Sequence, residues 1–173
     1  MSAAPTLLIT LRFAQYLNYS LLPISYSLYE RTEYMKVAAV DFGDVRTGLA
    51  FSDLTGFISG RALTLTAQSK AELIQKICDE LKAEKAQKVV VGLPLNMDGS
   101  EGERAKKARA FALELEGACA LPTVMWDERG TSVTANRLLS DAGKKKGKQR
   151  ARVDAVAASV ILQSFLDAGG GRG

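Results

Sequence analysis

The stretch "KVAAVDFGDVRTGLAFSD", residues 36–53, decides the fold of this chain. A run of mostly small apolar residues leads directly into Asp41, and Gly43 and Gly48 follow that acid closely. A carboxylate at the end of a buried strand costs free energy unless something compensates its charge. The stretch therefore predicts a strand that places Asp41 at the edge of a sheet, where another group compensates its charge.

The rest of the sequence predicts further strands and helices. Strands over residues 47–53 and 60–66 follow closely and predict an antiparallel meander with the first strand. Ser69 and Glu72 form a capping box before a helix over residues 70–81. The later elements are an apolar strand over 88–94, a helix over 100–117, a strand over 123–129, a short helix over 131–143 and a last helix over 153–168.

This order of elements predicts an α/β fold. Three meander strands followed by strand–helix–strand crossovers give a five-stranded mixed sheet, with parallel strands added to the meander and helices on both faces. The domain is predicted over residues 35–168, after an N-terminal extension over 1–34 and before a flexible tail over 169–173. All five tyrosines lie within the extension, which suggests either a separate segment or an upstream, non-native start.

The composition excludes several kinds of chemistry. The chain of 173 residues has no histidine, which rules out a Ser-His-Asp triad, a histidine general base and most zinc sites. Catalysis then depends on carboxylates, lysines or hydroxyls, and any metal is expected to be Mg²⁺ or Mn²⁺ held by oxygen. The net charge of +4 is compatible with an anionic partner.

The two cysteines and the hydropathy predict a cytoplasmic protein. Cys78 and Cys119 lie in separate segments without CxxC spacing and are interpreted as reduced, structural residues. No apolar run is long enough to cross a membrane, and the first residues lack the features of a signal peptide.

Carboxylates follow several of the predicted elements where the sheet should bind a ligand. Asp41 follows the first strand, and Asp127 with Glu128 ends the fifth, at the edge where open α/β sheets bind ligands. Asp154 opens the last predicted helix, at the border of its apolar stripe. Each has a simpler interpretation: a turn cap for Asp41, ion pairs with Arg129 for Asp127 and Glu128, and the helix dipole for Asp154. Together they favour a site for divalent cations that relieve the mutual repulsion.

The chain resembles the YqgF/RuvX family, whose members are named as Holliday junction resolvases and as pre-16S rRNA nucleases. The resemblance covers Met35 to about Asp167 and is carried by four motifs in order: "DFGDVRTGLAFSD", "VVVGLPLNMDGSEGERA", "DERGTSVTA" and "RVDAVAASVILQSFLD". It implies an RNase H-like fold and a catalytic set of carboxylates, namely Asp41, Asp127, Glu128 and Asp154. Asp41, Asp127 and Asp154 would be the metal ligands, although either Asp127 or Glu128 can face inward because neighbours on a strand point opposite ways.

One motif departs from related resolvases. RuvC-type resolvases carry an acid at the end of the fourth strand, where this chain reads "GLPLN", so the ligands around the metal are expected to differ.

Other polar residues are candidates for binding nucleic acid. Arg46 can clamp a phosphate or be solvated, Asn96 can reach the substrate or cap its loop, and Arg129 can stabilise developing charge or pair with Glu128. Gly43 and Gly48 allow a phosphate to approach the backbone, with an ordinary turn as the alternative. The predicted loop over residues 144–152 carries six cations and leads into Asp154: Lys144, Lys145, Lys146, Lys148, Arg150 and Arg152. A solvated charge run is the alternative to phosphate contact.

The leading hypothesis is a metal-dependent nuclease, a hydrolase of phosphodiester bonds acting on structured RNA or branched DNA as a monomer or homodimer. The resemblance implies 5′-end maturation of pre-16S rRNA in ribosome biogenesis, or Holliday junction cleavage in recombination and repair. Two alternatives remain. The D-x-G-x-x-x-x-G pattern of "DFGDVRTG" also resembles the phosphate loop of actin-like ATPases, although those need a second domain. A non-catalytic module that binds ribosomal RNA through the basic loop is the other.

Overall fold

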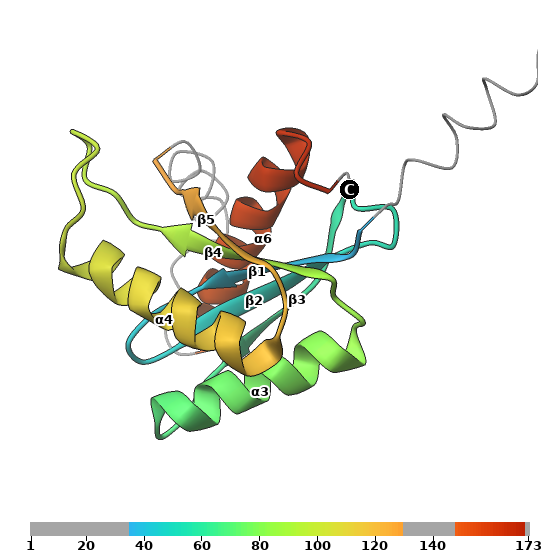
Figure 1. The fold of residues 1–173 in the computed structure, drawn as a ribbon, viewed down its shortest axis with the longest axis horizontal. Helices are drawn as coiled ribbons and strands as arrows, with labels where there is room; N and C mark the ends of the chain where they lie inside the picture. The colour runs from blue at the N-terminus through green and yellow to red at the C-terminus, as the bar shows by residue number, and fades with distance from the viewer. Residues whose placement is uncertain (1–34, 130–147, 172–173) are drawn as a thin grey trace, which may run out of the picture. The chain divides into compact units, whose positions relative to one another are not determined.

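The computed structural model describes residues 35–129 and 148–171, with side chains of the second range described from Val153 onward. These residues form one mixed five-stranded sheet with strand order β3-β2-β1-β4-β5 and three helices (Figure 1). The strands are β1 (Val37–Asp41), β2 (Thr47–Ser52), β3 (Ser59–Leu65), β4 (Lys88–Leu93) and β5 (Thr123–Asp127). The helices are α3 (Lys70–Ala83), α4 (Glu103–Cys119) and α6 (Lys148–Asp167). The short helix predicted over 131–143 lies outside the described residues.

The sheet combines a meander with parallel crossovers, as the sequence predicted. β1 and β3 both pair antiparallel with β2, while β4 pairs parallel with β1 and with β5. The carboxyl ends of β1, β4 and β5 therefore lie along one edge of the sheet, which we call the carboxyl edge.

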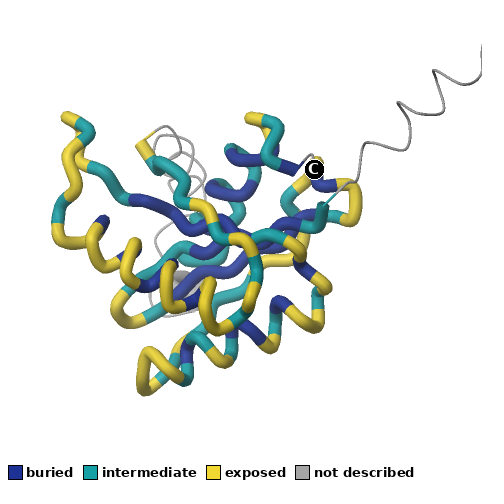
Figure 2. The backbone as a smooth tube through the Cα atoms, in the orientation of Figure 1, coloured by how far each residue is buried: buried dark blue, intermediate teal, exposed yellow. Residues whose placement is uncertain are grey.

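Helices cover both faces of the sheet. Successive residues of β1 point to opposite faces of the sheet, so they contact different helices. Ala38 and Val40 pack in a core cluster with α3 and α4, whereas Val37 and Ala39 pack in a second cluster with α6. Figure 1 shows α3 and α4 on one side of the sheet and α6 on the other, and Figure 2 shows the central strands as the most buried part. The predicted fold class is confirmed.

Helix α6 begins earlier than the sequence predicted. The prediction placed a loop over residues 144–152 and the helix from Val153, but residues 148–152 already form the start of α6. The apolar stripe that located the helix begins at Val153, while Lys, Gln, Arg and Ala before it are good helix formers without a breaker among them. The basic residues of this part therefore lie on a helix and not in a loop.

The last described residues, 169–171, make backbone hydrogen bonds to the rest of the domain. The Gly170 N–H donates to the Phe165 carbonyl at 3.0 Å, and the Gly171 carbonyl accepts from the Met35 N–H at 3.3 Å. Gly171 is buried. Gly171 thus contacts the start of the domain at Met35, while the flexibility of the tail over 169–173 stays a prediction.

Cys78 and Cys119 form a disulfide, so the prediction of two reduced cysteines is wrong for this structure. Cys78 lies on α3 and Cys119 ends α4, and these helices pack side by side on the same face of the sheet. The missing CxxC spacing carried no information, because tertiary packing brings together residues separated by 41 positions with their Cα atoms 5.4 Å apart.

Removing this disulfide is expected to destabilise the domain. A loop of this length corresponds to about 4 kcal/mol in the chain-entropy model, so we expect roughly 2–4 kcal/mol for the double variant Cys78→Ser with Cys119→Ser. Thermal unfolding of wild type with and without reductant, beside the double variant, measures this. An unchanged melting temperature under reductant would show that the bond contributes nothing in solution.

Candidate active site

Asp41 lies at the carboxyl edge, at the end of β1, the middle strand of the five-stranded sheet. It is the last residue of β1, and strand alternation places its side chain on the α6 face with Val37 and Ala39. Burial raises the pKa of Asp41, the nearby Asp154 raises this pKa further, and Arg104 lowers it. The surroundings of Asp41 therefore make its ionised form less favourable than that of a solvated aspartate.

Glu128 lies on the same face and reaches towards Asp41. A Cβ atom at Gly92 of β4 would lie 2.0 Å from Glu128 Oε1 and 2.8 Å from Ile161 Cδ1 of α6, so the carboxylate occupies the space over this glycine. Because β4 lies between β1 and β5, Glu128 extends across β4 in the direction of β1. Burial raises the pKa of Glu128 to about 7, and Asp41 contributes to that rise while Arg104 opposes it.

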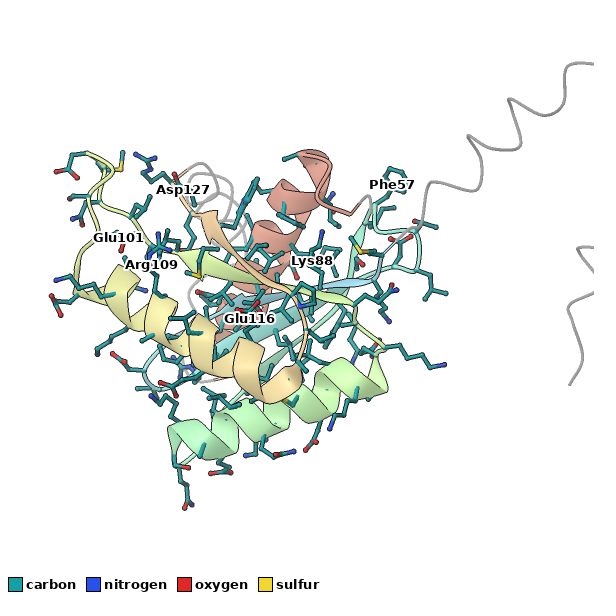
Figure 3. All side chains as sticks on the ribbon, viewed as in Figure 1. Phe57, Lys88, Glu101, Arg109, Glu116 and Asp127 are labelled. Carbon is teal, nitrogen blue, oxygen red and sulfur yellow. A yellow bond between two sulfur atoms is a disulfide. The ribbon has the colours of Figure 1, made fainter. Side chains whose placement is uncertain are left out.

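Asp127 faces away from this pair. It accepts hydrogen bonds from Nε and Nη2 of Arg129 at 2.9 and 2.6 Å, and its side chain is 40% exposed. These hydrogen bonds lower the pKa of Asp127. Figure 3 shows Asp127 at the carboxyl edge, far from Phe57 at the opposite end of the sheet. The structure thus brings Glu128, not Asp127, towards Asp41.

Asp154 approaches the site from α6. Its Oδ2 accepts a hydrogen bond from Arg46 Nε at 2.8 Å, an ion pair between the β1–β2 turn and the helix. Asp154 is the seventh residue of α6, not part of the first turn as the sequence predicted. Since the favourable dipole effect is confined to the first turn, the helix dipole no longer accounts for this acid.

Gly48 allows α6 to approach the sheet closely. A Cβ atom at this position would lie 2.0 Å from the Asp154 carbonyl oxygen. The sequence predicted that a phosphate would approach the backbone here, but the backbone of α6 occupies that space. At Gly43 a Cβ atom would lie 2.5 Å from the Arg46 carbonyl oxygen, which supports the simpler interpretation of a tight turn.

Gly48→Ala is expected to destabilise the domain by about 2 kcal/mol and to displace Asp154, because a backbone carbonyl cannot rotate away from the new methyl group. Thermal unfolding measures the first effect. Gly117→Ala in α4 is the matched control, since nothing lies within 4 Å of a Cβ there and alanine favours the helix. Equal melting temperatures for the two variants would contradict this account of Gly48.

The donor chemistry at the carboxyl edge fits an oxygen-ligated divalent cation. Asp41 interacts with Glu128 on one side and with Asp154 on the other, and each interaction raises a carboxyl pKa through repulsion. A hard cation relieves this repulsion. Within residues 35–129 and 153–171, no three metal-binding side chains are already gathered as a cluster. Binding would therefore have to draw these carboxylates together around Asp41.

Three of the residues predicted to contact nucleic acid are bound to other groups of the protein. Arg46 is held by Asp154, Arg129 is held by Asp127, and the Asn96 side-chain amide donates to Ser100 Oγ at 2.8 Å within its own loop. The described contacts of Asn96 thus match the loop-capping alternative. Lys144, Lys145 and Lys146 lie outside the described residues. Lys148, Arg150 and Arg152 lie on α6 with side chains that are not described, so their contacts stay a prediction.

Sequence reasoning missed Arg104. This residue opposes the raised pKa values of both Asp41 and Glu128. It lies in the first turn of α4, where a cation is unfavourable because the helix dipole is positive there. That misplaced charge, directly after an acidic helix start, was the available sequence signal.

The fold of this chain resembles that of RuvC. Two solved structures of Thermus thermophilus RuvC, one free and one in complex with a Holliday junction, superpose on 80% of this chain and 98% of theirs. The TM-scores are 0.51 and 0.52 at 13% and 12% sequence identity, so the likeness concerns the fold alone. The predicted RNase H-like fold is confirmed.

The sequence comparisons identify the family. The family model described as "RuvX: Holliday junction resolvase" matches residues 35–168. A protein of Pelotomaculum thermopropionicum named "Putative pre-16S rRNA nuclease" is 40% identical over 137 residues, which cover 79% of this chain and 89% of the relative. A protein of the same name from Anaeromyxobacter sp. strain K is 41% identical over 133 residues, covering 77% and 97%. This chain therefore belongs to the RuvX family, a nuclease family, as its motifs predicted.

Proposed function

We propose that this protein is a metal-dependent nuclease that hydrolyses phosphodiester bonds at the 5′ end of pre-16S rRNA. The observation that carries the proposal is the placement of Asp41 between Glu128 and Asp154 at the carboxyl edge, in a chain of a nuclease family. The names of the curated relatives support the substrate.

Three carboxylates have the proposed central role. Asp41, Glu128 and Asp154 would hold Mg²⁺ or Mn²⁺, with Glu128 in place of Asp127 because Asp127 binds Arg129. A divalent cation held there would supply an activated water and stabilisation of charge on the oxygens of an in-line displacement at phosphorus. Cleavage would leave a 5′-phosphate and a 3′-hydroxyl.

Holliday junction cleavage is the second candidate function. The description of the matching family model favours it, and the same carboxylates would perform the same displacement. A symmetric junction needs two active sites, so this function would require a homodimer, whereas rRNA processing can proceed with a monomer.

A cleavage assay decides between these functions. Purified protein, with and without residues 1–34, meets end-labelled pre-16S rRNA fragments and four-way DNA junctions in Mg²⁺, Mn²⁺ or chelator. We expect metal-dependent cutting of the RNA at its mature 5′ end. Preferential cutting of the junction would favour the second function. Tight RNA binding without cutting in any metal would contradict the nuclease and favour the non-catalytic module.

We propose a cytoplasmic location, where ribosomal precursors and chromosomal DNA are both present in bacteria. Among the described residues, no helix combines the length and apolar character that a membrane span requires. Reducing compartments keep most cysteine pairs as thiols, so the Cys78–Cys119 disulfide counts against a cytoplasmic location. Alkylation of free thiols during cell lysis, followed by mass spectrometry, measures the oxidised fraction. A fully oxidised pair would contradict a reducing location.

A further inference from the structure

A cavity of about 250 Å³, which we call the turn cavity, opens at the carboxyl edge on the face of the sheet that α3 covers. It lies between the β1–β2 turn, the end of β3 and the start of α3, which Figure 1 shows on the same side of the molecule. Phe42 lines this cavity and packs with the core on the α3 face, whereas Asp41 before it points to the α6 face. The turn cavity and the acidic edge are therefore neighbours, separated only by the end of β1.

The walls of the turn cavity are mostly apolar. Leu65 closes it from β3 and Leu73 from α3. Phe42 is held in place because its ring stacks on that of Phe111 in α4, with the ring centroids 4.2 Å apart. Val45 lies at the rim and is 76% exposed. Apolar walls and an exposed apolar residue at the rim suit a ligand with a flat, apolar ring.

One polar side chain at the base of the turn cavity has no partner. Thr47, the first residue of β2, lines the cavity although it is fully buried, and it lies beside Leu65 of β3. Its Oγ1 makes no hydrogen bond within the described part of the chain. A buried hydroxyl without a partner costs free energy. A ligand whose polar edge reaches the base of the cavity would supply the missing hydrogen bond.

The start of α3 places backbone donors at the rim. The Glu72 N–H donates to Ser69 Oγ at 3.2 Å, but the N–H groups of Lys70 and Ala71 have no such partner among the residues that the structure describes. The Lys70 ammonium is bound to Glu114 of α4 at 2.6 Å, so the backbone and not this side chain is available. Free N–H groups at the positive end of a helix bind phosphate oxygens.

We propose that the turn cavity binds one unpaired nucleotide of the RNA strand that is cleaved, with its base against Phe42 and Val45 and its phosphate at the start of α3. This proposal rests on the proposed nuclease function. A base combines an apolar face for the walls with a polar edge for Thr47, and only an unpaired, unstacked base can enter a cavity. A strand that crosses the acidic edge at Asp41 reaches the cavity over the β1–β2 turn. Cleavage is thereby directed to sites with an unpaired nucleotide close to the cleaved bond.

The first test compares Thr47→Val with Ser59→Ala in the full-length protein. Ser59, at the start of β3, carries the other buried hydroxyl that lacks a partner among the described residues, and it lies outside the turn cavity. Binding of a labelled single-stranded pre-16S rRNA fragment is measured in chelator, so that nothing is cut. We expect Thr47→Val to weaken binding about 5- to 10-fold and Ser59→Ala to match the wild type. Both variants should melt at or above the wild-type temperature, because each removes an unsatisfied buried group.

The second test changes the RNA. Single nucleotides are replaced in turn by abasic ones, and at one position we expect binding to the wild type to weaken about 10-fold, the loss of one bound base. At this position Val45→Ser should show a smaller loss, since it removes an apolar group from the rim. Leu54→Ser is the matched control, because Leu54 is 77% exposed on the β2–β3 loop, outside the cavity. Pairing the same position with a complementary strand should weaken binding as the abasic nucleotide does.

Equal RNA binding by Thr47→Val and Ser59→Ala would overturn the proposal, as would a fragment in which no abasic position weakens binding. A free nucleoside monophosphate that shifts the methyl NMR signals of Leu65 and Thr47 without competing with RNA would assign the cavity to a small nucleotide and also overturn it. The binding tests do not depend on cutting. If one base binds through Thr47 but the wild type cuts nothing in any metal, the nuclease proposal fails while the nucleotide site stands. Metal-dependent cutting without any effect of Thr47→Val or of abasic positions would keep the nuclease and remove the nucleotide site.

Discussion

Asp41→Asn is expected to reduce the single-turnover rate of RNA cleavage by at least about 1,000-fold. Asp41 is the carboxylate that both Glu128 and Asp154 approach, so it is the shared member of the proposed metal site. An amide keeps the size of the side chain but removes the charge that would hold a cation.

The loss should not arise from unfolding. Burial and Asp154 raise the pKa of Asp41, so its ionised form is less favourable in the folded state than in the unfolded state. Stability from this group therefore falls as the pH rises through the unfolded-state pKa, and Asn removes that penalty at neutral pH. We expect a melting temperature for Asp41→Asn at or above that of the wild type, measured beside the cleavage rate.

Asp127→Asn is the matched control, because it removes a carboxylate from the same edge that faces Arg129. It is expected to retain cleavage within about 10-fold of the wild type. If Asp127→Asn and Asp41→Asn lost activity equally, Asp127 would have to turn inward when the metal binds. A fully active Asp41→Asn would remove Asp41 from the mechanism.

Most of the fold could be predicted from the sequence because its strands and helices have clear local patterns. The near-continuous apolar run of β4 indicates a strand buried on both faces, and Ser69 with Glu72 indicates the start of α3. In the structure Ser69 Oγ accepts from the Glu72 N–H at 3.2 Å, and Glu72 accepts from the Gln68 N–H at 2.8 Å. Each of these signals depends on residues only a few positions apart, so a single sequence is enough to recognise it.

The features that could not be predicted depend on contacts between distant segments. The Cys78–Cys119 bond requires α3 and α4 to pack with these two residues in register, which no local spacing reveals. The choice between Asp127 and Glu128 depends on the register of β5 against β4 and on the space over Gly92. Strand alternation showed only that the two acids face opposite ways. The influence of Arg104 on the pKa values of Asp41 and Glu128 is of the same kind.

Glu128→Gln is expected to stabilise the folded protein at pH 8 while it abolishes cleavage. Glu128 has a folded-state pKa of about 7, because of burial first and Asp41 second, against a usual value of 4.5. Well below pH 4.5, the folded and the unfolded protein both hold the proton of Glu128, and its shifted pKa contributes nothing to the free energy of unfolding. Between the two values the unfolded state loses its proton first, so stability falls as the pH rises, and above about 7 the full penalty remains. Glutamine removes this penalty, which amounts to about 3 kcal/mol.

Unfolding by urea at pH 4.5 and at pH 8 measures this prediction. The gain from Glu128→Gln should be small at the lower pH and close to its full value at the higher one. Glu103→Gln is the control, since Glu103 is largely exposed and pairs only with Lys106 within its helix; its effect should be small at both values. A variant that is more stable yet cuts at least about 1,000-fold more slowly would show a carboxylate retained for function at a cost in stability. Equal gains at both pH values would instead assign the effect to packing over Gly92, and undiminished cleavage would remove Glu128 from the proposed metal site.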